Sequence, residues 1–380
     1  MTAPIRILEV VNAMDRAGLE TMIMNYYREF DRNRIQLDFL VHRDWRGDYE
    51  DEIESLGGRV YRAPRLYPQH WLAYRKFMHR FFSVHRYPVV HSHIDSMSTF
   101  PLALAKECGV PVRIAHSHNE SVDFDLKYPI KELARRKLPK AANHYWACSL
   151  ASGIYLFGET HLREIHVVRN AIDLEAFRFD NAEREKVRSK LKISQGQIAI
   201  GHVGRFSKVK NHTFLVKLLG ELRRRGKDAV LVLAGDGELR AEIEKMAQDM
   251  RLSAYIRFLG VRDDIEDIIN SFDVVVFPSI HEGIPLALIE AQANGLPVLA
   301  SDAVSNESLL LSTAENLPLE APIKEWADAT IRLAQEGRSE NAVKILTNAG
   351  YEIHRTAREL SNTYMLLYNA ALYSKEHTCV

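Results

Sequence analysis

The sequence predicts an α/β protein that is built from two doubly wound domains. Its 380 residues are more than one hydrophobic core usually organises, so two domains of ordinary size are expected. Short β-branched runs alternate with longer stretches of helical periodicity, which is the pattern of a parallel sheet. This alternation occurs as two separate series, each long enough for one such domain.

The two series define the predicted elements and the domain boundary. Strands of the first series are predicted at 5–11, 37–41, 89–92, 112–116 and 145–149, with helices at 20–30 and 71–85. Strands of the second series are predicted at 198–203, 229–234, 256–259, 273–277 and 298–301. A polar crossing at 169–185 separates the series, and a long closing helix is predicted at 352–373. We therefore expect one domain at 1–170, with a helix at about 353–380 packing back on it, and a second at 171–352.

Composition excludes several classes of protein. Equal totals of basic and acidic residues, 50 each, remove any whole-chain argument for nucleic acid as a partner. Cys108, Cys148 and Cys379 lie far apart without metal-ligand spacing, which fits a reducing compartment. The first apolar run is too short for a signal peptide, and no segment has the length of a membrane span. A cytoplasmic protein is expected, with any membrane contact peripheral.

The most informative segment is 277–291, with the sequence FPSIHEGIPLALIEA. It places a loop after a predicted strand and opens a helix at about Pro285, a residue suited to the first helical turn. A helix N-terminus presents free amides and a positive dipole end, and Gly283 allows an anion to approach the backbone closely. The segment predicts a phosphate-binding turn.

Two acids flank this turn. Glu282 lies in the loop, and Glu290 lies in an otherwise apolar part of the helix, where a carboxylate needs a partner. A ribose diol is suitable because one carboxylate accepts hydrogen bonds from both hydroxyls. Taken singly, Glu282 is interpreted as a solvated loop acid, and Glu290 as a buried acid satisfied by a neighbouring lysine or backbone group. Together with the turn, the pair favours a binding function.

This string, Glu-Gly-Ile-Pro-Leu-x-x-x-Glu after Phe-Pro-Ser, resembles the E-x7-E signature of retaining glycosyltransferases with the GT-B fold, the group 1 type of exopolysaccharide and capsule synthesis. The resemblance covers most of the chain and is strongest in the second domain. It implies two facing Rossmann-like domains with a cleft between them. It further implies that Glu282 meets the transferred sugar or its phosphate and that Glu290 holds the ribose. The donor's diphosphate would face the turn residues Gly283, Ile284, Pro285 and Leu286.

Two further segments of the second half support the resemblance. Arg205 and Lys210 follow the strand at 198–203 and match the family's Gly-Arg-x-x-x-x-Lys segment, although their spacing alone is that of ordinary surface cations. Cations beside a diphosphate stabilise the negative charge that builds up as the glycosidic bond breaks. The stretch after the strand at 256–259 resembles the family segment that reads the nucleotide base, which implies a secondary contact from Arg262. Gly235 and Gly237 are interpreted first as packing residues.

The first half carries weaker signals. Gly18 follows the first strand and opens a helix, so it is a candidate for close approach to phosphate or sugar, although Ala17 replaces the first of the family's paired glycines. His116 and His118 share one face of a strand end, which makes metal binding conceivable. His118 resembles the family's contact to the donor sugar, with Asn119 in place of the usual acid. His91 and His93 are expected to be hydrogen-bonded strand-end histidines.

Residues 59–94 contain seven Arg or Lys, eight Phe, Tyr or Trp, and no Asp or Glu. Such a segment suits anionic lipid or a lipid-linked acceptor, and it equally suits a core helix with a solvated basic face. Asp123-Phe124-Asp125 is an Asp-x-Asp string, which holds a metal ion in glycosyltransferases of a different fold. Here it is expected to be incidental, and no metal or other cofactor is predicted.

The predicted function is transfer of a sugar from a nucleotide diphosphate, UDP by family frequency, to a saccharide or lipid-linked saccharide, with retention of anomeric configuration. An epimerase or hydrolase on the same architecture is the first alternative, and product analysis with donor alone separates it. A noncatalytic sugar-nucleotide-binding scaffold is the second. If the protein is such a scaffold, polysaccharide production should survive a change of Glu282 but not deletion of the protein.

Overall fold

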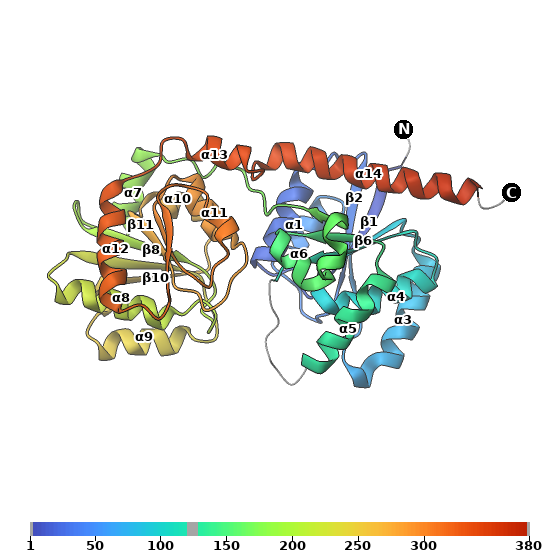
Figure 1. Ribbon diagram of the computed structural model, residues 1–380, viewed down its shortest axis with the longest axis horizontal. Helices are drawn as coiled ribbons and strands as arrows, with labels where there is room; N and C mark the ends of the chain where they lie inside the picture. Colours follow the sequence, from blue (N-terminus) through green and yellow to red (C-terminus); the bar gives the residue numbers. More distant parts are fainter. Residues whose placement is uncertain (1–2, 120–127, 378–380) are drawn as a thin grey trace. The chain divides into compact units, whose positions relative to one another are not determined.

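The computed structural model describes residues 3–119 and 128–377, with side chains up to residue 373 (Figure 1). Its contacts divide the chain into two compact units. The first comprises Met1–Ala171 together with Ile353–Val380, and the second comprises Ile172–Glu352. The Asp123–Asp125 string lies outside the described residues.

The described part of the first unit contains a sheet of seven parallel strands in the order β3-β2-β1-β4-β5-β6-β7. These strands are β1 (Ile5–Val11), β2 (Ile35–Val41), β3 (Val60–Arg62), β4 (Val89–Ser92), β5 (Val112–Ser117), β6 (His144–Ala147) and β7 (Ile165–Val167). Every residue of β2 and of β4 is buried, as expected for strands covered by helices on both faces.

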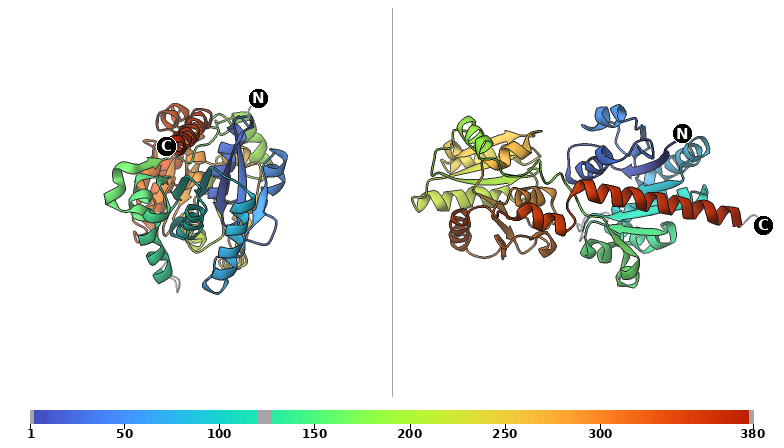
Figure 2. Two further views of the ribbon diagram at one scale, coloured as in Figure 1. Left: turned by 90° about the vertical axis from the view of Figure 1, so that its right-hand side faces the viewer. Right: turned by 90° about the horizontal axis from the view of Figure 1, so that it is seen from above.

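Helices connect these strands and cover both faces of the sheet (Figures 1 and 2). They are α1 (Gly18–Glu29), α2 (Glu50–Ser55), α3 (Trp71–Val84), α4 (Thr99–Glu107), α5 (Tyr128–Ala141) and α6 (Leu150–Phe157), with short 3-10 turns η1 (Pro68–His70), η2 (Asp95–Ser98) and η3 (Glu159–Glu164). Because the chain proceeds from β1 to one side of the sheet and from β4 to the other, the unit is doubly wound.

The second unit, described over all of 172–352, has a sheet of six parallel strands in the order β10-β9-β8-β11-β12-β13. These strands are β8 (Ile198–Val203), β9 (Ala229–Ala234), β10 (Ile256–Gly260), β11 (Val274–Phe277), β12 (Val298–Ser301) and β13 (Ala314–Leu317). Its helices are α7 (Asn181–Lys190), α8 (His212–Arg224), α9 (Arg240–Asp249), α10 (Ile265–Asn270), α11 (Leu286–Ala293), α12 (Ile323–Glu336) and α13 (Ala342–Asn348), with turns η4 (Ser253–Tyr255) and η5 (Asn306–Ser308). The same winding makes this unit a second Rossmann-like domain.

The last helix, α14 (Ile353–His377), belongs to the first unit although it follows the second in the sequence. It lies along the amino-terminal unit and packs against α1 and β5 (Figure 2). Its buried face includes Ile353, Ala357, Leu360 and Tyr364, the helical spacing expected from the sequence. The amino-terminal domain is therefore discontinuous in the sequence.

The basic and aromatic segment 59–94 forms β3, α3 and β4. On α3, Tyr74, Met78, Phe81 and Phe82 are buried in the hydrophobic core, whereas Leu72 is exposed. Burial is thus the main role of these α3 side chains, as in the core-helix interpretation.

The sequence located the central strands but not three short ones. β3, β7 and β13 contain three or four residues each and lie at sheet edges, where partial exposure removes the apolar run that reveals a buried strand. The helix expected to open at about Pro285 begins at Leu286, with Pro285 at the preceding N-cap position. Among the described residues, no helix combines the length and apolarity needed to cross a bilayer.

Candidate functional site

The candidate residues of the second unit gather around the centre of its sheet. β8 and β11 are neighbours, yet the chain continues from β8 toward β9 and β10 and from β11 toward β12 and β13. Open α/β sheets bind ligands at such a switch point, outside the carboxyl ends of the strands. The loops after β8 (204–211) and after β11 (278–285) meet there.

An ion pair joins these two loops. Lys210 Nζ lies 2.6 Å from Glu282 Oε1, and each side chain retains about a sixth of its exposure. The Lys210 ammonium also lies 5.7 Å from the centroid of the Phe277 ring. Asn211, in a left-handed conformation, donates a hydrogen bond from its side-chain amide to the carbonyl of Pro278 at 3.0 Å. The structure therefore brings together the catalytic candidates Lys210 and Glu282, which lie far apart in the sequence.

The backbone of Glu282 is fixed by the loop after β12. Its N–H donates to the carbonyl of Ala303 and its carbonyl accepts from the N–H of Ser305, each at 3.1 Å. These two bonds hold the turn that follows, so the Glu282 side chain is presented from an ordered backbone.

The turn from Gly283 to Leu286 leads into the N-terminus of α11. No side chain caps this helix, and the N–H groups of Gly283 and Leu286 have no acceptor among the described residues. Pro285 has no N–H, so its contribution is a fixed backbone angle rather than a donor. Ile284 is buried beneath the turn. Uncapped amides at a helix N-terminus are suited to an anion.

Glu290 lies further along α11 without a partner. In the described part of the chain, no cation or hydrogen-bond donor contacts its carboxylate. Burial raises the pKa of this carboxyl to about 7, and the nearby Glu266 carboxylate contributes to the rise. The interpretation of Glu290 as an acid satisfied by a neighbour therefore does not hold, and the carboxylate is available to a ligand.

The other two basic candidates lie in ion pairs of their own. Arg205 Nη2 is 3.1 Å from Glu238 Oε2, and the Arg205 side chain is 73% exposed. Arg262 forms a two-point pair with Asp264 at 2.8 and 2.5 Å. The structure thus does not gather Arg205 or Arg262 at the Lys210–Glu282 pair.

The glycines after β9 serve backbone packing. A Cβ atom on Gly235 would lie 2.1 Å from the carbonyl oxygen of Gly204, and one on Gly237 would lie 2.6 Å from the carbonyl oxygen of Phe206. Gly235 also has a φ of 135°. The interpretation of these glycines as packing residues is confirmed.

In the first unit, Gly18 is the first residue of α1. The N-cap residue Ala17 supplies no side-chain cap, and a Cβ atom on Gly18 would meet no atom of the described residues within 4 Å. Burial raises the pKa of the nearby Glu20 carboxyl to about 7, with Asp15 adding to the rise. The N-terminus of α1 is therefore open to a ligand.

His118 ends a row of three hydrogen-bonded side chains. Glu9 Oε2 is 2.7 Å from His93 Nε2, and His93 Nδ1 is 2.9 Å from His118 Nε2. Glu9 comes from β1, His93 from the end of β4 and His118 from the end of β5, so the row crosses the switch point of this sheet. Sequence reasoning missed Glu9. Glu9 could have been found as the carboxylate within the apolar run of β1, because a carboxylate buried in a strand requires a partner.

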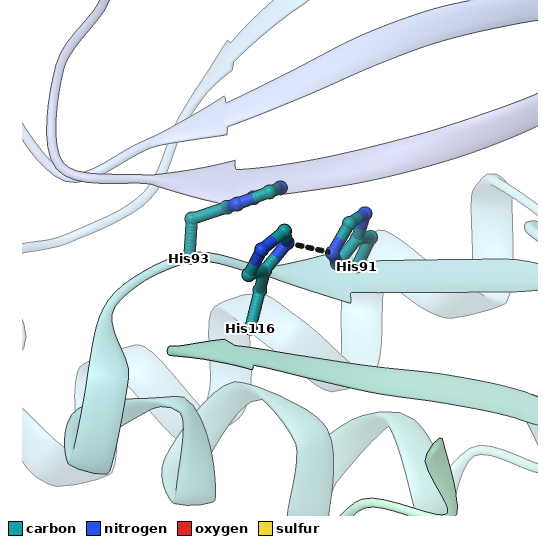
Figure 3. A group of neighbouring side chains, drawn as sticks. All are labelled: His91, His93 and His116. Carbon is teal, nitrogen blue, oxygen red and sulfur yellow. Dashed lines mark hydrogen bonds between the residues drawn. The ribbon is translucent and has the colours of Figure 1, made fainter. Parts of the chain in front are cut away.

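A second row begins on α14. Tyr364 Oη is 2.6 Å from His91 Nδ1. His91 Nε2 is 3.0 Å from His116 Nδ1, which is the hydrogen bond drawn in Figure 3. Tyr364 also donates to Glu9 Oε1 at 3.4 Å, which joins the two rows. His91 and His93 are thus hydrogen-bonded strand-end histidines, as expected. His116 Nε2 is buried and has no hydrogen-bond partner within 3–119 and 128–377.

Burial controls the charge of this histidine cluster. It lowers the pKa of His93 to about 4, and it lowers the pKa values of His116 and His118 well below the usual range, with the neighbouring imidazoles adding to each effect. Burial alone would raise the pKa of Glu9, but hydrogen bonds and charge from His91 and His93 lower it overall. The described cluster is therefore a buried carboxylate among mainly neutral imidazoles.

His91, His93 and His116 each offer a nitrogen within 4.8 Å of the others (Figure 3). Both ring nitrogens of His91 and of His93 already have hydrogen-bond partners, so a metal ion would have to displace those bonds. The arrangement is that of a hydrogen-bonded network.

The fold and these two switch points define a class of protein. Two Rossmann-like domains, one with a phosphate-suited turn and an unpaired carboxylate on the following helix, are the architecture of GT-B glycosyltransferases. A family model described as "Glycosyl transferase 4-like domain" matches residues 17–170, and one described as "Glycosyl transferases group 1" matches residues 183–350. The chain belongs to the group 1 glycosyltransferase family, and it is a glycosyltransferase.

Curated relatives agree with this assignment. The chain is 37% identical over 368 residues to the putative glycosyltransferase EpsF of Bacillus subtilis (strain 168), covering 94% of this chain and 96% of the relative. It is 25% identical over 298 residues to an Escherichia coli UDP-Gal:alpha-D-GlcNAc-diphosphoundecaprenol alpha-1,3-galactosyltransferase, covering 74% and 76% of the two chains.

Solved structures share the fold. Anabaena Alr3699/HepE, crystallised in complex with UDP and glucose, superposes with a TM-score of 0.79 at 18% identity, covering 95% of this chain and 99% of that one. At this identity the likeness supports the architecture, whereas the residues of the site rest on the geometry given above.

Proposed function

We propose that this glycosyltransferase moves a sugar from a UDP-linked donor to a saccharide or lipid-linked saccharide, with retention of anomeric configuration and without a metal ion. The observation that carries the proposal is the Lys210–Glu282 ion pair at the switch point of the second sheet. It places a cation and a carboxylate beside the uncapped turn before α11, where a sugar diphosphate presents both negative charge and hydroxyl groups.

The proposed donor contacts follow from this placement. The amides of Gly283 and Leu286 receive the diphosphate, with Ile284 and Pro285 shaping the turn. The unpartnered Glu290 carboxylate accepts hydrogen bonds from the ribose hydroxyls. Gly18 and Arg262 are further donor contacts, Gly18 because the start of α1 is open and Arg262 because it follows β10.

In the proposed reaction, the bond between the anomeric carbon and the diphosphate oxygen breaks through an oxocarbenium-like transition state. Lys210 and Arg205 stabilise the departing diphosphate, and for this Arg205 exchanges its exposed partner Glu238 for the ligand. The acceptor oxygen forms the new bond on the same face, and its proton passes to the diphosphate. Glu282 and His118 contact the transferred sugar.

Two relatives support the substrate classes. HepE was crystallised with UDP and glucose, and the Escherichia coli relative is named for transfer from UDP-Gal to a diphosphoundecaprenol-linked sugar. A lipid-linked acceptor in polysaccharide or glycolipid synthesis fits a cytoplasmic enzyme that contacts the membrane peripherally through the basic segment 59–94, where Arg75 and Arg80 lie on α3.

The test is a thermal-shift panel of UDP, GDP, ADP and their sugars without added metal, on wild type and on Glu290→Gln. Stabilisation by UDP that is reduced in Glu290→Gln is expected. Glu244→Gln, which removes an exposed acid on α9, is the matched control and should keep the full shift. Absence of any nucleotide shift in wild type, or an equal shift in Glu290→Gln, overturns the proposed donor site.

The reaction itself is tested by product analysis. Incubation of UDP-sugars with saccharide acceptors should give a glycoside whose anomeric proton coupling matches that of the donor. An inverted product contradicts the proposed stereochemistry, and free sugar formed at the same rate without acceptor contradicts transfer.

A further inference from the structure

In the row Glu9–His93–His118, the donor and the acceptor of each hydrogen bond can be assigned. An ionised carboxylate only accepts hydrogen bonds, so His93 must donate to Glu9 through Nε2, at 2.7 Å. A neutral imidazole donates from one nitrogen only, which leaves His93 Nδ1 as an acceptor. The hydrogen in the 2.9 Å contact between His93 Nδ1 and His118 Nε2 then belongs to His118.

His118 is held at its backbone as well as at its ring. Its N–H donates to Asp95 Oδ1 at 3.0 Å, and the side chain of Asn119 donates to Asp95 Oδ2 at 2.6 Å. Asp95 itself has a φ of 45°, which is uncommon for a residue other than glycine. The local structure thus fixes the place from which the ring reaches His93.

The other ring nitrogen of His118, Nδ1, is not part of this row. His118 is partly exposed, and its Nδ1 has no partner among the described residues. Because Nε2 carries the ring hydrogen, Nδ1 carries a lone pair.

We infer that Glu9 and His93 are positioning residues that hold His118 in the Nε2–H tautomer, so that Nδ1 accepts a hydrogen bond from a hydroxyl group of the bound sugar. This inference rests on the proposed role of His118 at the transferred sugar and deepens it, because it states which partner that nitrogen takes. A ligand group that lacks a hydrogen at this position, such as a carbonyl or ether oxygen, is disfavoured there.

The charge states in the structure agree with this direction. Burial lowers the pKa of His93, which disfavours the doubly protonated ring that would donate to both Glu9 and His118. Against the effect of burial, the charge of His91 and the hydrogen bonds from His91 and His93 keep the pKa of Glu9 below its usual value. Tyr364, which donates to the other oxygen of Glu9, adds a further bond to the same carboxylate.

The decisive measurement is the tautomer of His118 in the full-length protein without any ligand. In ¹⁵N-histidine-labelled protein, two-bond correlation spectra distinguish Nε2–H from Nδ1–H rings, and the His118 signals are those missing in His118→Gln. Wild type is expected to show Nε2–H. An Nδ1–H or charged His118 overturns the inference, and this arm requires no variant of Glu9 to fold.

The variant arm uses Glu9→Gln and a matched control. A glutamine amide both donates and accepts, so the row loses its direction, and His118 is expected to show both tautomers with kcat lowered about tenfold or more. Glu29→Gln removes the carboxylate of another histidine pair, with His354, and should leave both readouts unchanged. Glu9→Asp, which keeps the charge, should restore most of kcat relative to Glu9→Gln.

An unchanged tautomer and kcat in a folded Glu9→Gln contradict the inference. The thermal shift with UDP should stay as in wild type in this variant, because the donor diphosphate is assigned to the second unit. Failure of the proposed function is distinguishable: the tautomer then follows Glu9 as expected, while no nucleotide stabilises the wild-type protein.

Discussion

The two domains share one winding but differ in how the polar groups at their switch points are satisfied. In the amino-terminal domain, the buried Glu9 and His93 are hydrogen-bonded in a row to the partly exposed His118. In the carboxyl-terminal domain, the groups lie nearer the surface, and Glu290 has no partner in the described chain. The first site is therefore preorganised by internal hydrogen bonds, whereas the second leaves a carboxylate without an internal partner among the described residues.

The largest expected effect comes from removing the cation of the second site. Lys210→Ala should lower kcat by about 10² to 10³, because one preorganised group facing the departing diphosphate contributes on that scale. Steady-state kinetics with the donor identified by thermal shift measures the change.

Lys208→Ala is the matched control, because Lys208 is an exposed lysine of the same loop. It should retain kcat within about twofold, the size of effect expected for a solvated charge. A similar loss in both variants would show that the loop acts through its overall charge rather than through Lys210.

A smaller effect, on stability, should come from the first site. Tyr364→Phe leaves the buried His91 Nδ1 without its 2.6 Å partner, so the free energy of unfolding should fall by about 1 to 3 kcal/mol. Denaturant unfolding monitored by circular dichroism measures it. Tyr368→Phe, one turn further along α14 and partly exposed, should change stability by less than about 0.5 kcal/mol. Equal values for the two variants would contradict the idea of a network that holds this domain together.

The smallest effect concerns the unpaired carboxylate. Because the folded-state pKa of Glu290 is raised from 4.5 to about 7, the folded protein keeps a proton that the unfolded chain releases, and stability falls as pH rises through this window. Glu290→Gln removes this loss. The Tm difference between Glu290→Gln and wild type should therefore be larger at pH 8 than at pH 5. The free energy of unfolding of the variant should exceed that of wild type by about 1 kcal/mol more at pH 8 than at pH 5, after allowance for the partial exposure of Glu290.

Differential scanning calorimetry at the two pH values, with Glu244→Gln as control, tests this expectation. A pH-independent difference would mean that Glu290 is satisfied in solution by a group of the protein. A stabilised variant that also binds UDP less well would show a carboxylate kept for its ligand at a cost in stability.

The same contrast explains what could be predicted from the sequence. The second site was visible because its turn and both glutamates lie within 277–291, one strand-turn-helix unit whose spacing has a direct structural meaning. The pairing of Lys210 with Glu282 was not visible in the sequence, because it depends on β8 and β11 being neighbours in the sheet. The exposed pairing of Arg205 with Glu238 was likewise not visible, because it depends on where the loop after β9 lies relative to the loop after β8.

The first site was harder to predict because its members come from three strands. His118 was found by resemblance, whereas the link to Glu9 requires that β1, β4 and β5 lie side by side in register, with Glu9 opposite His91. The edge strands were missed for a related reason, since pairing rather than composition defines them. Which strands pair with one another cannot be predicted from the local sequence pattern.

The return of α14 to the amino-terminal domain has a consequence for how the protein is made. Glu9 is synthesised well before Tyr364, its hydrogen-bond partner 355 positions later. At translation rates of about 5 to 20 residues per second, roughly 20 to 70 s separate the two. During that interval the nascent amino-terminal domain carries an uncovered apolar surface on α1 and an incomplete polar cluster. The amino-terminal domain is thus completed only after the second unit has been synthesised, when α14 becomes available.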